Sequence, residues 1–182
     1  MDKILIFIAL SIILVIASWR ALFNINKHGF YRFFGWECMA WLFASVYKLW
    51  FSNPISVPQL ISWGLLLIAV YMVMAGAITL LREGKPGRER DEKNLYSFEK
   101  TTRLVDSGIF RYIRHPLYSS LIFLTWGIYF KGPSVELTLI AVMATLLLVI
   151  TALYDENECI AYFGSSYTQY MKRSKRFIPF VI

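Results

Sequence analysis

The apolar run Leu60-Ile-Ser-Trp-Gly-Leu-Leu-Leu-Ile-Ala-Val-Tyr-Met-Val-Met-Ala-Gly-Ala-Ile-Thr-Leu-Leu81 decides the fold class of this chain. It contains no charged residue, and at about 1.5 Å of rise per residue it is long enough to cross a hydrocarbon core of roughly 30 Å. The whole composition agrees, because 57% of the 182 residues are hydrophobic and only 17% are charged. The sequence therefore predicts an integral membrane protein built from apolar helices.

Four further apolar segments are shorter or carry a charge. They are Ile4 to Phe23, Phe33 to Phe51, Leu117 to Phe130 and Leu137 to Tyr154. The last two are separated by Lys131-Gly-Pro-Ser134 and a few more residues, which predicts a tight helical hairpin. We therefore expect an all-α, polytopic membrane bundle of about five transmembrane helices. The first segment also resembles a secretory signal, but it lacks a basic n-region and a clear cleavage site, so we expect it to be retained.

Basic residues distinguish the two sides of this bundle. Nine of the 19 Lys and Arg residues lie between Arg82 and Arg114, and four lie between Lys172 and Arg176, whereas residues 52–59 have none. Because positively charged loops are retained in the cytoplasm, we expect the N-terminus outside and the C-terminus in the cytosol. The net charge of +7 then indicates contact with an anionic membrane surface rather than with nucleic acid.

The organisation along the chain is that of a single domain, 1–182. Residues 1–81 supply three spans, 82–100 form a cytosolic connector of mixed charge with Gly and Pro, and 101–182 form the functional core. Cys38 and Cys159 offer neither a disulfide framework nor the spacing of metal ligands.

Two cytosolic segments carry the polar groups that are candidates for chemistry. In Leu104-Val-Asp-Ser-Gly-Ile-Phe-Arg-Tyr-Ile-Arg-His-Pro-Leu-Tyr118, a proline at the first turn places Arg114 and His115 at a helix N-terminus, which favours an anion site. Interfacial anchoring by the same basic and aromatic residues is an equally good interpretation. In Tyr154-Asp-Glu-Asn-Glu158, acids follow an apolar helix and oppose its dipole, so either the helix continues through Phe163 or the acids serve a cationic ligand. A solvated helix end is an equally good interpretation.

Taken together, these segments resemble the membrane methyltransferase superfamily of isoprenylcysteine carboxyl methyltransferases and phospholipid N-methyltransferases. Residues 104–118 follow the pattern L-V-x-x-G-x-[YF]-x-x-x-R-H-P-x-Y, and Asp155-Glu156 with Phe163-Gly-x-x-Tyr167-x-x-Tyr170 resembles the acidic pair and closing motif. The resemblance covers residues 101–182 and implies a cytosolic S-adenosyl-L-methionine pocket with no metal. It nominates as cofactor-binding residues Thr102, Arg103, Leu104, Val105, Phe110, His115, Pro116, Leu117, Tyr118, Asp155 and Glu156.

One departure from the family pattern narrows the chemical class of the methyl acceptor. The carboxyl-methylating enzymes place an Arg about one turn before the acidic pair, where this chain has Thr151 and where no Lys or Arg occurs from Gly132 to Met171. A buried carboxylate without a cation is costly, so an amine acceptor is the simpler expectation, and Leu153-Tyr-Asp-Glu156 resembles the Leu-Tyr-Glu-Glu of phospholipid N-methyltransferases. Arg114 and Glu156 are the predicted catalytic residues. Arg114, or Arg173, can substitute for the missing Arg, and Glu156, or Asp155, is a candidate base for an amine.

Two other functions stay open at this point. Membrane sterol reductases, which use a nicotinamide cofactor, resemble the chain in the same two segments but are much longer. A lipid-binding protein without catalysis would leave His115 and the acids without a ligand. We therefore expect a membrane methyltransferase acting on a lipid-like or small amphipathic acceptor that enters from the bilayer.

Overall fold

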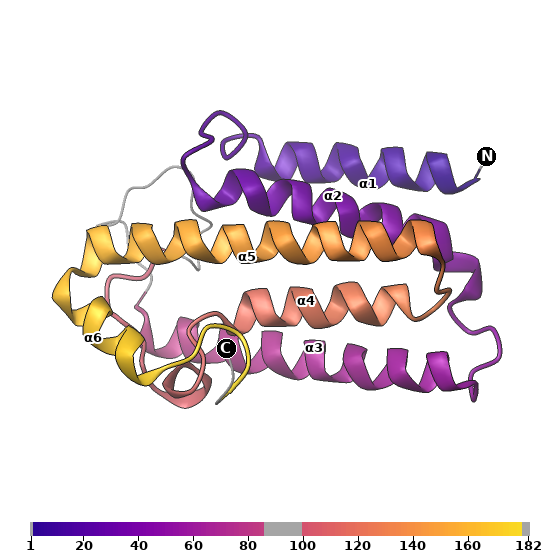
Figure 1. Ribbon diagram of the computed structural model, residues 1–182. Helices are drawn as coiled ribbons and strands as arrows, with labels where there is room; N and C mark the ends of the chain where they lie inside the picture. The colour runs from indigo at the N-terminus through magenta and orange to yellow at the C-terminus, as the bar shows by residue number, and fades with distance from the viewer. Residues whose placement is uncertain (1, 86–99, 180–182) are drawn as a thin grey trace.

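The computed structural model describes residues 2–85 and 100–179, and these residues form a helical bundle (Figure 1). Short 3-10 turns occupy residues 47–49 and 108–111. Most of the predicted connector lies outside the described residues. The all-helical prediction is confirmed for the described part of the chain, and its helices are α1 (Asp2–Ser18), α2 (His28–Val46), α3 (Val57–Glu83), α4 (Pro116–Tyr129), α5 (Val135–Phe163) and α6 (Ser165–Arg173).

Among the described helices, α3 and α5 are long and apolar enough to cross a membrane. Large apolar side chains on α3 face outward, and Leu67 is 70% exposed, as expected for a surface that contacts lipid. The predicted spans all coincide with helices, while the number of crossings stays a prediction. Helix α5 runs on past Tyr154 to Phe163, so the acidic residues belong to the helix itself.

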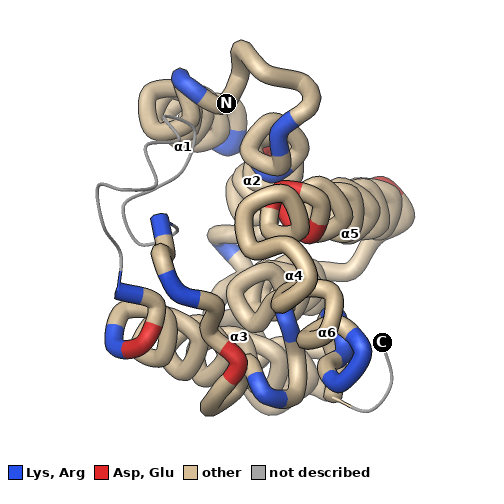
Figure 2. Tube along the Cα trace, turned by 90° about the vertical axis from the view of Figure 1, so that its left-hand side faces the viewer, with Lys and Arg blue, Asp and Glu red and all other residues tan. Residues whose placement is uncertain are grey.

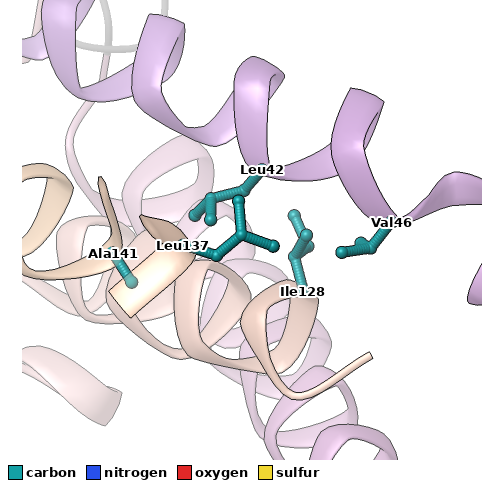
Figure 3. Close-up of a cluster of buried hydrophobic side chains, with 5 residues drawn as sticks. All are labelled: Leu42, Val46, Ile128, Leu137 and Ala141. Atoms are coloured by element: carbon teal, nitrogen blue, oxygen red, sulfur yellow. The ribbon is translucent and has the colours of Figure 1, made fainter. Parts of the chain in front are cut away.

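The predicted hairpin is formed by α4 and α5, which lie side by side in Figure 1. The Ser134 side chain accepts a hydrogen bond from the backbone N–H of Leu137 at 3.3 Å and so caps the start of α5. At the same end, Lys131 donates to Gln59 Oε1 of α3 at 2.9 Å, which ties the hairpin turn to the neighbouring helix. The hairpin packs on α2 through the buried side chains in Figure 3, namely Leu42, Val46, Ile128, Leu137 and Ala141.

The charged residues gather at one end of the bundle. The α1–α2 connection, the C-terminal ends of α3 and α5, and α6 all lie at the left of Figure 1. Figure 2 looks at this end and shows Lys, Arg, Asp and Glu on α2, α3, α5 and α6. Gly164 turns the chain here from α5 into α6 with φ 61° and ψ −133°, a conformation that glycine adopts most readily. The polar segments of the sequence therefore meet at a common end.

Helices α3 and α4 approach each other closely at Gly127. A Cβ atom there would lie 2.8 Å from Leu66 Cδ2, and the Ser62 hydroxyl of α3 donates to the Gly127 carbonyl at 2.6 Å. Small residues allow this kind of close packing between membrane helices. The contact fixes α4, and with it the segment that precedes it, against α3.

We expect Gly127→Ala to lower the free energy of unfolding by about 1–3 kcal/mol, because the added methyl overpacks the contact with Leu66. Gly64→Ala is the matched control, since no atom lies within 4 Å of its added Cβ. That change should stabilise α3 by up to about 1 kcal/mol through helix propensity. Thermal unfolding of both variants in the same detergent tests the pair, and equal shifts would contradict the close contact.

Candidate functional site

The C-terminal segment pairs with the backbone that precedes α4. Lys175 N–H donates to Tyr112 O at 2.9 Å, Arg114 N–H to Lys175 O at 2.7 Å, and His115 N–H to Arg176 O at 3.1 Å. This short parallel pairing is centred on Ile113 and Lys175. It brings Arg176 beside His115, although the two residues are far apart in the sequence.

Side chains of α6 and α4 hold the same region. The Tyr170 hydroxyl of α6 donates to the Phe110 carbonyl at 2.6 Å, and the Ser119 hydroxyl of α4 donates to the Phe177 carbonyl at 2.9 Å. Burial raises the pKa of the Tyr167 and Tyr170 hydroxyls, so both remain neutral over the ordinary pH range. Tyr170 and Phe177 of the C-terminal part are thus bonded to the 104–118 segment and to the start of α4.

Glu156 lies at the centre of a buried ionic cluster. Its Oε1 accepts from Arg114 Nε at 2.9 Å and Arg176 Nε at 3.0 Å, and its Oε2 accepts from Arg176 Nη2 at 2.8 Å. His115 Nε2 lies 3.3 Å from the same Oε1. Glu156 is only 3% exposed, and a buried carboxylate of this kind requires such compensation. Arg114 also donates to the carbonyls of Met171 and Ser174, so it joins α5 to the tail.

Asp155 continues this network toward the N-terminal half of the protein. Its Oδ2 lies 3.5 Å from His115 Nδ1, and its Oδ1 lies 4.0 Å from His28 Nδ1 at the start of α2. His28 also contacts Glu158, whose Oε1 accepts from the His28 backbone N–H at 2.9 Å and lies 3.1 Å from its ring Nδ1. The acids of α5 therefore join α2 to the segment that precedes α4.

His115 has a carboxylate opposite each ring nitrogen, an arrangement that suits the doubly protonated imidazolium. Burial by itself would lower the pKa of His115, but the hydrogen bonds and charges of Asp155 and Glu156 outweigh it and raise the pKa above the usual range. The ring also stacks on Tyr118, with centroids 5.3 Å apart. His115 is thus an oriented imidazole, with its protonated form favoured, on the wall of a cavity.

This cavity opens between α3, α4, α5, α6 and the 101–110 segment, with about 750 Å³ of empty space including its mouth. Its wall combines apolar and aromatic side chains with a few charged ones. It includes nine of the eleven residues that the resemblance nominates for the cofactor: Arg103, Leu104, Val105, Phe110, His115, Pro116, Leu117, Tyr118 and Asp155.

The other nominated residues have different surroundings. Thr102 is not among the cavity-lining residues, and its hydroxyl donates to the Lys85 carbonyl at 2.9 Å. Glu156 lies behind the wall, in the ionic cluster, while Arg114 of the predicted catalytic pair does line the cavity. The roles of all these residues stay predictions.

Sequence reasoning missed two residues that complete the site. His28 lines the cavity from α2, but as a lone His in a segment without a motif it gave no signal. Arg176 belongs to a run of basic residues that was interpreted as part of the positive side of the membrane.

The family comparison agrees with the motif analysis. The model of the phospholipid methyltransferase family matches residues 90–166 of the chain. The resemblance to membrane methyltransferases is confirmed. The match contains the 104–118 segment and the acids of α5, and it ends just inside α6, before Arg176. No curated protein and no solved structure matches the chain significantly. The matched family implies methyl transfer at a membrane and gives no support to the sterol-reductase alternative.

We expect Glu156→Gln to destabilise the protein by about 3–5 kcal/mol, because it leaves the buried Arg114 and the partly buried Arg176 without their carboxylate. Asp106→Asn is the matched control, since it removes the acid of the solvent-exposed ion pair with Arg173. Exposed pairs contribute about 0–1 kcal/mol. Unfolding in detergent should separate the two variants, and similar losses would show that the cluster is not a stabilising centre.

The raised pKa of His115 predicts how stability depends on pH. Its contribution is fully present below the unfolded-state pKa of about 6.5 and is lost as pH rises through the higher folded-state value. Stability should therefore fall as the pH is raised above neutrality, and His115→Gln should remove this part of the decline. Melting curves of both proteins between pH 6 and 9 test the sign, and an unchanged slope in the variant would contradict it.

Proposed function

We propose that this protein is an S-adenosylmethionine-dependent methyltransferase that acts on the headgroup amine of a phospholipid-like acceptor. The observation that carries the proposal is the cavity lined by residues of the matched family segment, with Asp155 and His115 on its wall. In this proposal five helices cross the membrane, the charged end faces the cytosol, and the acceptor enters from the bilayer.

The donor set of the cavity fits this cofactor. Asp155 supplies a carboxylate for the amino group, and the guanidinium groups of Arg103 and Arg114 are cations for the carboxylate. Leu104, Val105 and other apolar side chains offer walls for a flat adenine. When bound, S-adenosylmethionine supplies a methyl group that its sulfonium already activates. The residues of the chain therefore have to position the reactants and exclude water.

The contacts of the two acids favour different roles. Glu156 is buried in the ionic cluster and balances the charges of Arg114, Arg176 and His115, which makes it a positioning residue in this proposal. Asp155 lines the cavity, so it is the acid of the pair that can contact a ligand directly. An amine acceptor has to lose a proton before its lone pair attacks. Burial by itself would raise the pKa of Asp155, but the hydrogen bond to His115 and the neighbouring positive charges outweigh it and lower the pKa, so this carboxylate is suited to holding a cation rather than to accepting that proton.

An amine rather than a carboxylate acceptor is supported by the surroundings of α5. Thr151 is fully buried and its hydroxyl donates to the Leu147 carbonyl at 2.7 Å, so it offers no charge to an acceptor carboxylate. The match to phospholipid methyltransferases points in the same direction.

The proposal predicts that Asp155→Asn weakens binding of S-adenosylhomocysteine by about 10- to 100-fold, as expected for a lost charged hydrogen bond. The matched control is Asp106→Asn, an Asp-to-Asn change whose acid lies outside the set of cavity-lining residues. Calorimetry on detergent-purified protein measures both, with NADPH titrated in parallel. Binding of NADPH alone would overturn the proposal, and so would failure of the wild type to transfer labelled methyl into a lipid extract.

A further inference from the structure

A second cavity lies on the other side of Tyr118 and Phe177 and shares no lining residue with the first. It contains about 1,140 Å³ of empty space, open to the surroundings, between α3, α4, α5 and the C-terminal segment 176–178. Its wall is almost entirely apolar, and Ile122, Phe123, Trp126 and Val149 are representative. We name this second cavity the apolar groove.

The apolar groove is long enough to hold an acyl chain. Its lining runs from Ser119 on α4 to Phe130 at the end of that helix, twelve residues that span eleven helical steps. At about 1.5 Å per step this corresponds to roughly 16 Å. A hydrocarbon chain lying along α4 would therefore be covered by apolar side chains over this length.

The groove has one charged residue, Arg176, at its polar end. Arg176 donates to Glu156 through Nε and Nη2, while its Nη1 makes no hydrogen bond within the described residues. The side chain is 27% exposed, so it is not sealed off from a ligand in the groove. Guanidinium groups suit phosphate oxygens in charge and geometry.

Arg176 also connects the groove to the first cavity. The carboxylate of Glu156 lies between its guanidinium and His115, whose ring is on the wall of the first cavity. The Glu156 carboxylate is shared by Arg114 and Arg176, so one acid faces two guanidinium groups. Arg176 is therefore only partly neutralised by Glu156, which favours an anion beside it.

From these observations we infer that the apolar groove binds one acyl chain of a phospholipid whose phosphate contacts Arg176. The inference rests on the proposed function, since this lipid is then the methyl acceptor and its amine is directed toward the first cavity. It goes beyond the proposed function because it names the groove and Arg176 as the site that binds the acceptor. Detergent, a second copy of the chain or its own residues 180–182 are alternative occupants that the experiments below separate.

Occupancy of the apolar groove is tested without catalysis by photo-cross-linking. The protein is placed in phosphatidylcholine nanodiscs that also contain phosphatidylethanolamine with a photoreactive diazirine in one acyl chain. We expect cross-links to Ile122, Phe123 and Trp126 that excess phosphatidylethanolamine suppresses. Val149→Phe fills the groove and should reduce them about tenfold. Leu146→Phe is the matched control, because Leu146 lies on the same helix but is 53% exposed. Equal labelling of both variants, or labelling confined to the outer face of α3, would overturn the inference.

The phosphate contact is tested by labelled-methyl transfer. Arg176→Gln should raise KM about tenfold for phosphatidylethanolamine but leave KM for a long-chain alkyl amine, which has no phosphate, within about twofold. Arg176→Lys should recover part of the loss by restoring the charge. A rise in KM for both substrates would show that Arg176 acts only through the fold, and would overturn its assignment.

The two proposals fail in different ways. If the wild type binds S-adenosylhomocysteine and the lipid cross-links in the groove but no methyl is transferred, the proposed activity on this acceptor is wrong and the groove remains a lipid site. If methyl is transferred to phosphatidylethanolamine and Val149→Phe changes neither KM nor cross-linking, the proposed function stands and the groove assignment falls.

Discussion

The charged end of this protein depends on the compensation of a single buried carboxylate, that of Glu156. A carboxylate removed from water is stable only when cations and hydrogen-bond donors replace its solvation. Here the donors come from Arg114, His115 and Arg176, which lie in two separate segments of the chain. The need to compensate the Glu156 carboxylate therefore holds the C-terminal segment against the start of α4. At the same place, the backbone of residues 112–115 pairs in parallel with that of residues 175–176.

The fold could be predicted largely from the sequence, because apolar length and the turn at 131–134 are local signals. All five predicted spans coincide with helices, and Pro116 and Gly164 lie at the helix ends where their backbone preferences place them. The extension of α5 through Asp155 and Glu156 was left open, because acids near a helix C-terminus oppose the helix dipole. Their pairing with His28, His115 and two arginines removes that objection, and it depends on tertiary contacts that no local pattern reports.

The site was predicted only where a motif was present. Nine nominated residues line one cavity because the 103–118 segment wraps around it and Asp155 faces it from α5. The motif gave two neighbouring acids equal weight, and helix geometry separates them: Asp155 lines the cavity while Glu156 turns toward the arginines. His28 and Arg176 lie outside the motif, and each becomes part of the site through a contact with an acid of α5.

Thr151 and Arg176 together indicate where the charged group of an acceptor can bind in a chain whose α5 lacks the arginine of the carboxyl-methylating enzymes. Thr151 is fully buried, and its hydroxyl donates to the Leu147 carbonyl of the same helix. Position 151 therefore offers no cation that could bind an acceptor. The tail instead supplies Arg176, which reaches Glu156 from outside α5 and borders the apolar groove. A cation in that position is separated from the first cavity by Glu156, His115 and the Phe177 ring. Arg176 is therefore suited to bind a charged group that lies some distance from the reacting atom. In a phospholipid headgroup, the phosphate is separated from the amine in this way.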